Sequence, residues 1–356
     1  MLHNPQLLPL VPERVLRARY VYERYDTRFR AAARLLQAVW RERRDLPFGH
    51  HVDAKGARRR LGSVLAPGAA RSGGNFLSPD IFGQARLDLA YREPGALIDA
   101  ERLWSNLLSS MPLAFNLLAP LKTDRALARR TLNHVLPGAL KRVAHIQLEH
   151  SPGRGDPIFT ADGTAFDALI TGRGPEGQRR FVGLEIKYAE SLVEPEPRLR
   201  PRYDELSRSS GLYAEPDDEA LRRNPLQQFW RQHMLAQAMV DCELYDEGVY
   251  VLIAPRQNRE VQRGAHRYAR TLADSAGKVR FVRIDLEDMI EALRKAGASE
   301  HADALYTRYC DFDPVHDLVR AACLPARRRA RPTRTRARRR QPPRPTPAAA
   351  KRVAGR

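Results

Sequence analysis

The sequence has few cysteines and no long apolar run. Its three cysteines, Cys242, Cys310 and Cys323, are far apart and form no Cys-x-x-Cys pair. This argues against a disulfide framework and against a structural zinc site. No stretch approaches the roughly 18 consecutive apolar residues that a membrane helix needs. The first residues also lack the basic and apolar regions of a signal peptide. We therefore expect a soluble, cytoplasmic protein that has no membrane partner.

Two common catalytic motifs are missing as well. The sequence has no glycine-rich phosphate loop at the start of an expected helix, because the Gly-Arg-Gly at 172–174 falls between two expected strands. It also has no Gly-x-Ser-x-Gly elbow of the kind that presents a nucleophilic serine. The sequence thus gives no support to nucleotide-driven chemistry or to a serine hydrolase.

Acidic residues are absent from the C-terminal stretch, where much of the positive charge lies. The formal net charge is +19, from 61 Lys and Arg against 42 Asp and Glu, and 13 of these bases lie within residues 326–356. The rest of the chain has 48 bases against 42 acids, a net charge of +6. Residues 325–356 are therefore expected to form a disordered, basic tail. Such a concentration of positive charge is typical of segments that bind nucleic acid.

The N-terminal residues 1–75 are expected to be a helical segment followed by a linker. Residues 15–44 lack Gly and Pro and predict one long helix or two shorter ones. His50 and His51 are adjacent and lack the spacing of metal ligands, so a solvated loop is expected there. Residues 56–75 are rich in Arg, Gly, Ala and Ser, which predicts a mobile connection.

Helices are expected next, at the start of a domain that spans 76–324. Residues 97–111 carry an apolar stripe at helical spacing, which Pro112 should end. Glu101 lies at the edge of this stripe. Asp124 is expected to cap a later helix.

The hydrophobic period then changes to that of strands. Strands are expected over residues 143–149, 164–170, 180–188, 248–254 and 279–284. A loop is expected over 194–224, and a helix is expected from Pro225. Together these elements predict an α/β fold with a mixed central sheet flanked by helices.

Charged residues inside the expected strands are the main functional signal. Glu185 and Lys187 are two positions apart in an apolar strand, so both side chains should point to the same face of the sheet. Asp167 is embedded in the preceding strand, across a short hairpin. Burying such charges is costly unless they have partners. Two carboxylates can hold a hard cation such as Mg²⁺, and a lysine can orient a water or bind a phosphate.

This pattern of Asp167, then Glu185-Ile186-Lys187 across a hairpin, resembles the PD-(D/E)XK nucleases. The likeness extends to the order of elements over about residues 97–254. It implies a fold of the restriction-endonuclease-like type, with Mg²⁺ or Mn²⁺ held by Asp167, Glu185 and the carbonyl of Ile186, and with Lys187 as a catalytic residue. The proline of the family motif is missing, because Phe166 precedes Asp167.

Further candidates come from the same resemblance. Some members carry a supporting Gln on the helix after the lysine strand and others carry an acid on the first helix, which points to Gln228 and Glu101. Arg231 flanks Gln228 and could meet a phosphate. The alternative for Gln228 and Glu101 is an ordinary surface position. Asp162 and Glu149 are spare acids near the site, with Asp162 better explained as a turn residue.

Three functional interpretations follow. The first is a metal-dependent phosphodiesterase, nuclease-like, that acts on DNA. The second is a nucleic-acid-binding protein that uses the same fold and the basic tail without cleavage, and the third is an interaction protein that binds through the tail. The complete set of two acids and a lysine favours the first, because each buried charge would be costly without chemistry. The oligomeric state is open, with a dimer as one option.

The tail generates the first prediction. Truncation after Pro325 should leave folding and the chemical step unchanged, because the removed residues have little apolar surface to bury. It should flatten the slope of log affinity for DNA against log salt, by about 0.9 for each phosphate that the tail would otherwise neutralise. Fluorescence anisotropy with a labelled DNA duplex measures this slope. An unchanged slope would show that the tail does not bind nucleic acid.

Overall fold

A computed structural model describes residues 7–52, 55–96, 98–193, 196, 198–274 and 278–324. The elements up to Ala322 belong to one compact unit. The expected basic tail lies outside the described residues. Within those ranges no helix is both long and apolar enough to cross a membrane, and the three cysteines are free, as their spacing predicted.

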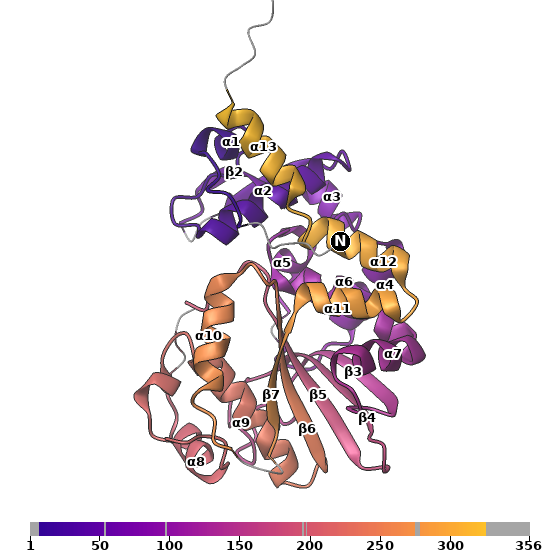
Figure 1. The fold of residues 1–356 in the computed structure, drawn as a ribbon, viewed down its shortest axis with the longest axis vertical. Helices are drawn as coiled ribbons and strands as arrows, with labels where there is room; N and C mark the ends of the chain where they lie inside the picture. Colours follow the sequence, from indigo (N-terminus) through magenta and orange to yellow (C-terminus); the bar gives the residue numbers. More distant parts are fainter. Residues whose placement is uncertain are drawn as a thin grey trace, which may run out of the picture. The chain divides into compact units, whose positions relative to one another are not determined.

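A mixed sheet occupies the centre of this unit (Figure 1). Its strands, in spatial order, are β3 (Arg142–His150), β4 (Phe166–Arg173), β5 (Arg179–Ile186), β6 (Glu247–Ala254) and β7 (Arg280–Asp285). β3, β4 and β5 form an antiparallel meander, whereas β5, β6 and β7 run parallel. The expected α/β fold with a mixed central sheet is confirmed, because each predicted strand exists to within a few residues.

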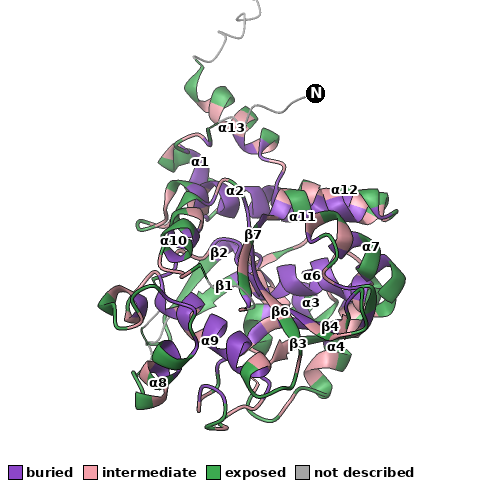
Figure 2. Ribbon diagram, turned by 60° about the horizontal axis from the view of Figure 1, so that its bottom comes forward, coloured by how far each residue is buried: buried purple, intermediate pink, exposed green. Residues whose placement is uncertain are grey.

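Helices cover both faces of the sheet, as Figure 1 shows. One face packs against α6 (Ser110–Thr123), α7 (Arg125–Val135) and α11 (Leu286–Lys295), and the other against α8 (Pro201–Ser209), α9 (Gln227–Asp241) and α10 (Arg259–Ala269). In β6, Val251 and Ile253 belong to the first core, while Tyr250 and Leu252 belong to the second. Burial on two faces explains why this strand is a continuous apolar run. Buried residues accordingly concentrate in α2, α6 and α9 (Figure 2).

The N-terminal part contains more structure than its sequence indicated. It consists of α1 (Glu13–Arg17), α2 (Arg28–Glu42), β1 (Phe48–Val52), β2 (Arg58–Leu65), α3 (Pro67–Arg71) and α4 (Pro79–Ala90). The second option for residues 15–44, two helices, is correct. The expected loop at His50 and His51 and the connection over 56–75 are wrong, because β1 and β2 pair as an antiparallel hairpin. The first half of β2 is exposed, so it lacks the apolar alternation that reveals a strand.

The helix expected over residues 97–111 is divided in two. α5 (Ala100–Ser105) stops before Asn106, which forms a bridge to Val64, and α6 then begins at Ser110. Pro112 does not end a helix but lies in the first turn of α6, where its missing N–H is tolerated. Residue 97 is outside the described residues. The cap expected at Asp124 is confirmed, since its Oδ1 accepts a hydrogen bond from the Leu127 N–H at 2.8 Å.

The expected loop over residues 194–224 is also wrong in part. It contains α8 and the short 3-10 helix η1 (Glu219–Arg222). Pro201 occupies the first turn of α8, a position where proline's fixed φ favours a helix. The chain then ends, within the described residues, with two helices that the sequence did not reveal, α12 (Ser299–Tyr309) and α13 (Asp313–Cys323).

A buried arginine joins α12 to the N-terminal elements. The side chain of Arg308 is 0% exposed. Its two Nη atoms donate to the backbone and side-chain oxygens of Asn75, at 2.7 and 2.5 Å, and its guanidinium lies 4.1 Å from the ring centroid of Trp40. Gln37 of α2 donates both to the Arg308 carbonyl at 2.8 Å and to the hydroxyl of Tyr188, just after β5, at 3.0 Å. This network therefore connects α2, α12 and the end of β5.

Replacing Arg308 should destabilise the fold strongly. Arg308→Ala leaves the Asn75 oxygens without these donors and opens a cavity, so we expect a loss of about 3–5 kcal/mol in the free energy of unfolding. Arg308→Lys should cost less, since an ammonium keeps the charge but cannot make the same forked contact. Urea denaturation measures both. Equal stability of Arg308→Ala and the wild type would contradict a structural role.

Candidate active site

Three acids lie side by side at one end of the meander. Ala168 of β4 pairs with Leu148 of β3 and with Leu184 of β5. Glu149 follows Leu148 in β3, Asp167 precedes Ala168 in β4, and Glu185 follows Leu184 in β5. Because β4 is antiparallel to its two neighbours, these three acids form the adjacent row across the sheet. Neighbouring strands are about 5 Å apart, so these carboxylates face one another closely. The predicted proximity of Asp167 and Glu185 is therefore present, and Glu149 extends the row.

Glu185 and Lys187 form a buried ion pair on the α9 side of the sheet. Their exposures are 2% and 6%, and Lys187 Nζ lies 2.8 Å from Glu185 Oε1. Gln228 bridges the pair: its Nε2 donates to Glu185 Oε1 at 2.8 Å, and its Oε1 accepts from Lys187 Nζ at 2.8 Å. Buried charges of this kind are tolerated only when they are hydrogen-bonded. The structure thus brings Gln228 into the site, as the resemblance implied.

Gln232 is a further member of the site that the sequence alone did not single out. It lies one turn after Gln228 on α9 and is 4% exposed. Its Nε2 donates to Glu185 Oε2 at 2.6 Å and to the Ala165 carbonyl at 2.8 Å, while its Oε1 accepts from the Tyr250 hydroxyl at 2.6 Å. The spacing of four residues places Gln232 on the same helix face as Gln228, because positions i and i+4 share one face, but the spacing alone assigns it no role.

Asp167 contacts the strand that carries Glu185. Its Oδ2 accepts a hydrogen bond from the backbone N–H of Ile186 at 2.6 Å. Burial, followed by the charges of Glu185 and Glu149, raises the pKa of Asp167 well above its usual value, although Lys187 and the Ile186 N–H oppose the shift. Burial and the neighbouring acids together therefore disfavour the charged form of Asp167.

Glu149 has an unusual backbone and an unusual acidity. Its φ is +51°, in the left-handed region that few non-glycine residues adopt. Burial, and then the charge of Glu185, raises its pKa to about 7, while Arg102 and Arg154 lower it. The sequence suggested only that Glu149 was a spare acid near the site. Its strained position within the row indicates that this carboxylate is held there by the surrounding fold.

Glu190 anchors the turn that follows Lys187. Its carboxylate accepts hydrogen bonds from the backbone N–H groups of Ser110 at 2.9 Å and Tyr188 at 2.8 Å. Burial alone would raise the pKa of Glu190, but the charge of Lys187 and these donors outweigh it and lower the pKa. The turn after the lysine is therefore fixed to the start of α6.

Arg231 and Asp162 stabilise the approach to β4. Arg231 Nη1 donates to Thr164 Oγ1 at 3.0 Å and lies 3.5 Å from Asp162 Oδ2. Asp162 also accepts from the Thr164 N–H at 2.9 Å and from the Tyr203 hydroxyl at 2.6 Å. These contacts favour the interpretation of Asp162 as a turn residue. A phosphate contact by Arg231 stays a prediction.

Glu101, the other supporting candidate, lies apart from these contacts. It is exposed on α5, and its carboxylate makes no hydrogen bond or ion pair with any of the described residues. Its neighbour Arg102 is the residue of α5 that acts electrostatically on the row, through Glu149. A role for Glu101 therefore stays a prediction without a contact to support it.

The donor set suits a hard cation better than a soft one. In the described part of the chain, no group of three or more His, Cys, Asp and Glu is arranged as a ready-made metal site. A metal would instead draw on the carboxylates of Asp167 and Glu185, with the carbonyl of Ile186 and water as further oxygen ligands. Oxygen ligands of this type, partly supplied by water, fit Mg²⁺ or Mn²⁺.

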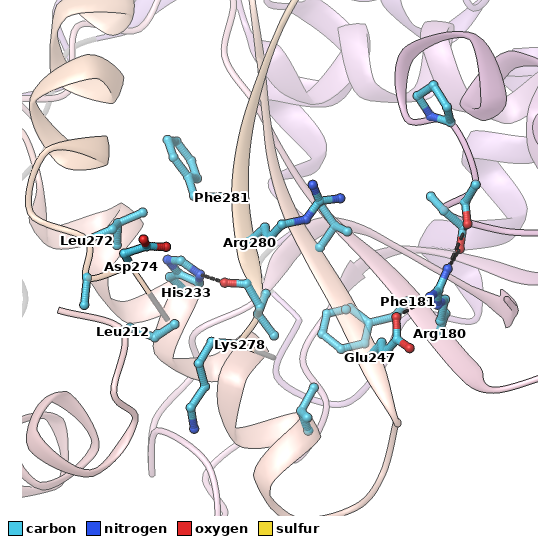
Figure 3. Close-up of a pocket in the computed structure, with 18 residues that line it drawn as sticks. Arg180, Phe181, Leu212, His233, Glu247, Leu272, Asp274, Lys278, Arg280 and Phe281 are labelled. Carbon is cyan, nitrogen blue, oxygen red and sulfur yellow. Dashed lines mark hydrogen bonds and ion pairs between the residues drawn. The ribbon is translucent and has the colours of Figure 1, made fainter. Parts of the chain in front are cut away.

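A cavity of about 620 Å³ lies near the start of β5, at the opposite end of this strand from Glu185 (Figure 3). Its walls include Arg180 and Glu247, near the starts of β5 and β6. His233 lies against it but is fully occupied: Nε2 donates to the Val279 carbonyl at 2.7 Å and Nδ1 accepts from the Tyr268 hydroxyl at 2.9 Å. Burial lowers the pKa of His233 to about 4, so it is a neutral core residue rather than a ligand.

Comparison with known proteins identifies one family. The family model described as PD-(D/E)XK nuclease superfamily matches residues 24–311. This match includes β3 to β7, α9 and the N-terminal elements from residue 24. Neither the comparison with curated proteins nor the comparison with solved structures returned a match.

The two glutamines should contribute unequally to stability. Gln232→Ala should cost about 1–3 kcal/mol, because Tyr250 and Glu185 each lose a partner in a buried place and the half-buried Ala165 carbonyl loses its donor. Gln228→Ala should cost only about 0.5–1.5 kcal/mol, because Gln228 is partly exposed and the Glu185–Lys187 pair survives its loss. Urea denaturation of both variants tests the order. A larger loss for Gln228→Ala would contradict the hydrogen bonds described.

Proposed function

The chain belongs to the PD-(D/E)XK nuclease superfamily, and from this membership and the geometry of its site we propose that it hydrolyses phosphodiester bonds in DNA with a divalent metal ion. The observation that carries the proposal is the buried Lys187, 2.8 Å from Glu185 and one residue after the Ile186 N–H that binds Asp167. Fold membership alone would not assign a reaction, so the proposal depends on these side chains.

The roles of the residues follow from their chemistry. Asp167, Glu185 and the carbonyl of Ile186 would hold Mg²⁺ or Mn²⁺. When bound, such an ion polarises the scissile phosphodiester and lowers the pKa of an attacking water. Lys187 lies next to this position and would orient that water, help to deprotonate it, or bind the phosphate as a point charge.

The surrounding amides prepare the site for this chemistry. Gln228 and Gln232 hold both oxygens of Glu185 from α9, and the backbone of β5 holds one oxygen of Asp167. Partners of this kind fix the orientation of metal-binding carboxylates and lower the cost of reorganisation during reaction. These amide donors thus support a catalytic use of the acids.

The alternative is a nucleic-acid-binding protein that has this fold but cleaves nothing. The burial of Glu185 and Lys187 speaks against it, because binding a nucleic acid requires exposed positive charge rather than a buried ion pair. Burying Glu185, Lys187 and the neighbouring Asp167 reduces stability relative to an apolar core. A binding function would leave that cost without a compensating role.

Lys187 and the two acids should respond differently to mutation. Lys187→Ala should lower turnover by about 10²–10⁴-fold, the usual contribution of a positioned proton-transfer group. Mn²⁺ binding, measured by calorimetry, should survive and even strengthen, since a cation next to the carboxylates has gone. Asp167→Ala and Glu185→Ala should lose both metal binding and metal-dependent cleavage of DNA while the protein stays folded.

Lys187→Arg is the matched variant that separates the possible roles of the lysine. Arginine keeps the charge but does not lose its proton, so activity should not return if Lys187 transfers a proton. Full activity in Lys187→Arg would make the lysine a point charge for the phosphate. Full activity in Lys187→Ala would contradict the assignment of the site. A wild-type protein that fails to cleave DNA with every divalent metal ion tested would favour the non-catalytic alternative.

A further inference from the structure

The hairpin of β1 and β2 presents a row of basic residues. In its register His50 pairs with Arg60, and His51 with Arg59, and all four side chains are exposed. Residues that pair directly across two strands point to the same side. His51 and Arg59 therefore share one face of the hairpin, which lies outside the five-stranded sheet.

That face forms one wall of a cavity of about 520 Å³. His51 and Arg59 line it from the hairpin, Arg30 from α2 and Arg102 from α5. The segment 189–191, which begins two residues after Lys187, also lines this cavity. In Figure 1, α2 and α5 lie beyond the end of the sheet at which β7 leads into α11. The cavity is thus next to the proposed active site, at the end of the sheet where β5 stops.

Two arginines of this cavity contact the turn that follows Lys187. Arg102 lies 3.9 Å from Glu190, whose carboxylate accepts the backbone N–H of Tyr188 just after Lys187. Arg30 Nη1 donates to the Ala189 carbonyl at 3.1 Å. Positive charge therefore lies next to the turn that follows Lys187.

The exposed arginines keep capacity for another anion. Both oxygens of Glu190 already accept backbone N–H groups, so Arg102, with 48% of its side chain exposed, makes only a long contact with it. Arg59 is 51% exposed and pairs with Glu23 at the surface, where ion pairs contribute little. Arg34 differs, because it is 7% exposed and holds both oxygens of Asp26. It serves the fold rather than a ligand.

We infer that this cavity binds the backbone phosphates of the DNA strand next to the bond that is cleaved, with Arg59 and Arg102 as the principal contacts. The inference rests on the proposed function and adds the position of the substrate. A guanidinium presents a planar fork of donors that matches two phosphate oxygens. A DNA strand bound in this cavity would continue toward Lys187. Its next phosphate would then lie beside Asp167 and Glu185.

The test is the salt dependence of DNA binding by the full chain in EDTA, where no metal-dependent cleavage occurs. Fluorescence anisotropy with a labelled duplex would compare wild type, Arg59→Gln/Arg102→Gln and the matched double variant Arg59→Lys/Arg102→Lys between about 50 and about 200 mM salt. Arg129→Gln is the control for a missing charge, because Arg129 is exposed on α7 and does not line this cavity. Equal urea midpoints would show that the variants fold alike.

We expect the double Gln variant to reduce the slope of log affinity against log salt by about two, or about one for each phosphate that an arginine neutralises. The Lys variant should keep most of the slope, and Arg129→Gln should leave it unchanged. A slope for the double Gln variant equal to that of Arg129→Gln would overturn the inference. Cleavage plays no part in this readout, so a protein that binds in this way but never cleaves would contradict the proposed function and not the phosphate site.

Discussion

The buried pair of Glu185 and Lys187 is the constraint that the site depends on. Two opposite charges removed from water are stable only if nearly every donor and acceptor finds a partner. α9 provides Gln228 and Gln232, and the meander provides the row of acids alongside. The position of α9 on its face of the sheet is therefore required both for packing and for the hydrogen bonds to Glu185. A shift of α9 by one residue would remove both amides from the carboxylate.

The sequence was sufficient to predict the central sheet and the proximity of Asp167, Glu185 and Lys187, but not the elements around them. Strands β3 to β7 were predictable because their apolar periods are strong, and Asp167, Glu185 and Lys187 stood out because charge is rare in such strands. The hairpin of β1 and β2 was not predictable, since its exposed, arginine-rich half has no apolar alternation. Glu149 was missed as a full member of the row for a different reason. Only the pairing of β3 with β4 places it opposite Asp167.

The N-terminal elements share the core of the sheet. α2 buries Phe29, Leu35 and Leu36 in the same hydrophobic cluster as Val182 and Ile186 of β5. The hairpin next to it forms a wall of the arginine-lined cavity. Residues at the start of the chain thus contribute to stability and, in our inference, to substrate position. This agrees with the family match, which includes α2 and the hairpin as well as the sheet.

The network around Arg308 also has a consequence for how the protein is made. Gln37 donates to the hydroxyl of Tyr188, the residue after Lys187. It also donates to the carbonyl of Arg308, which lies 271 positions later in the chain than Gln37. Contacts of such long range close late in folding, because a large loop must be ordered first. A nascent chain that has not yet emerged past α12 lacks this support for the end of β5. The hydrogen bond that supports Tyr188, next to Lys187, is therefore complete only after α12 has been synthesised and packed against α2.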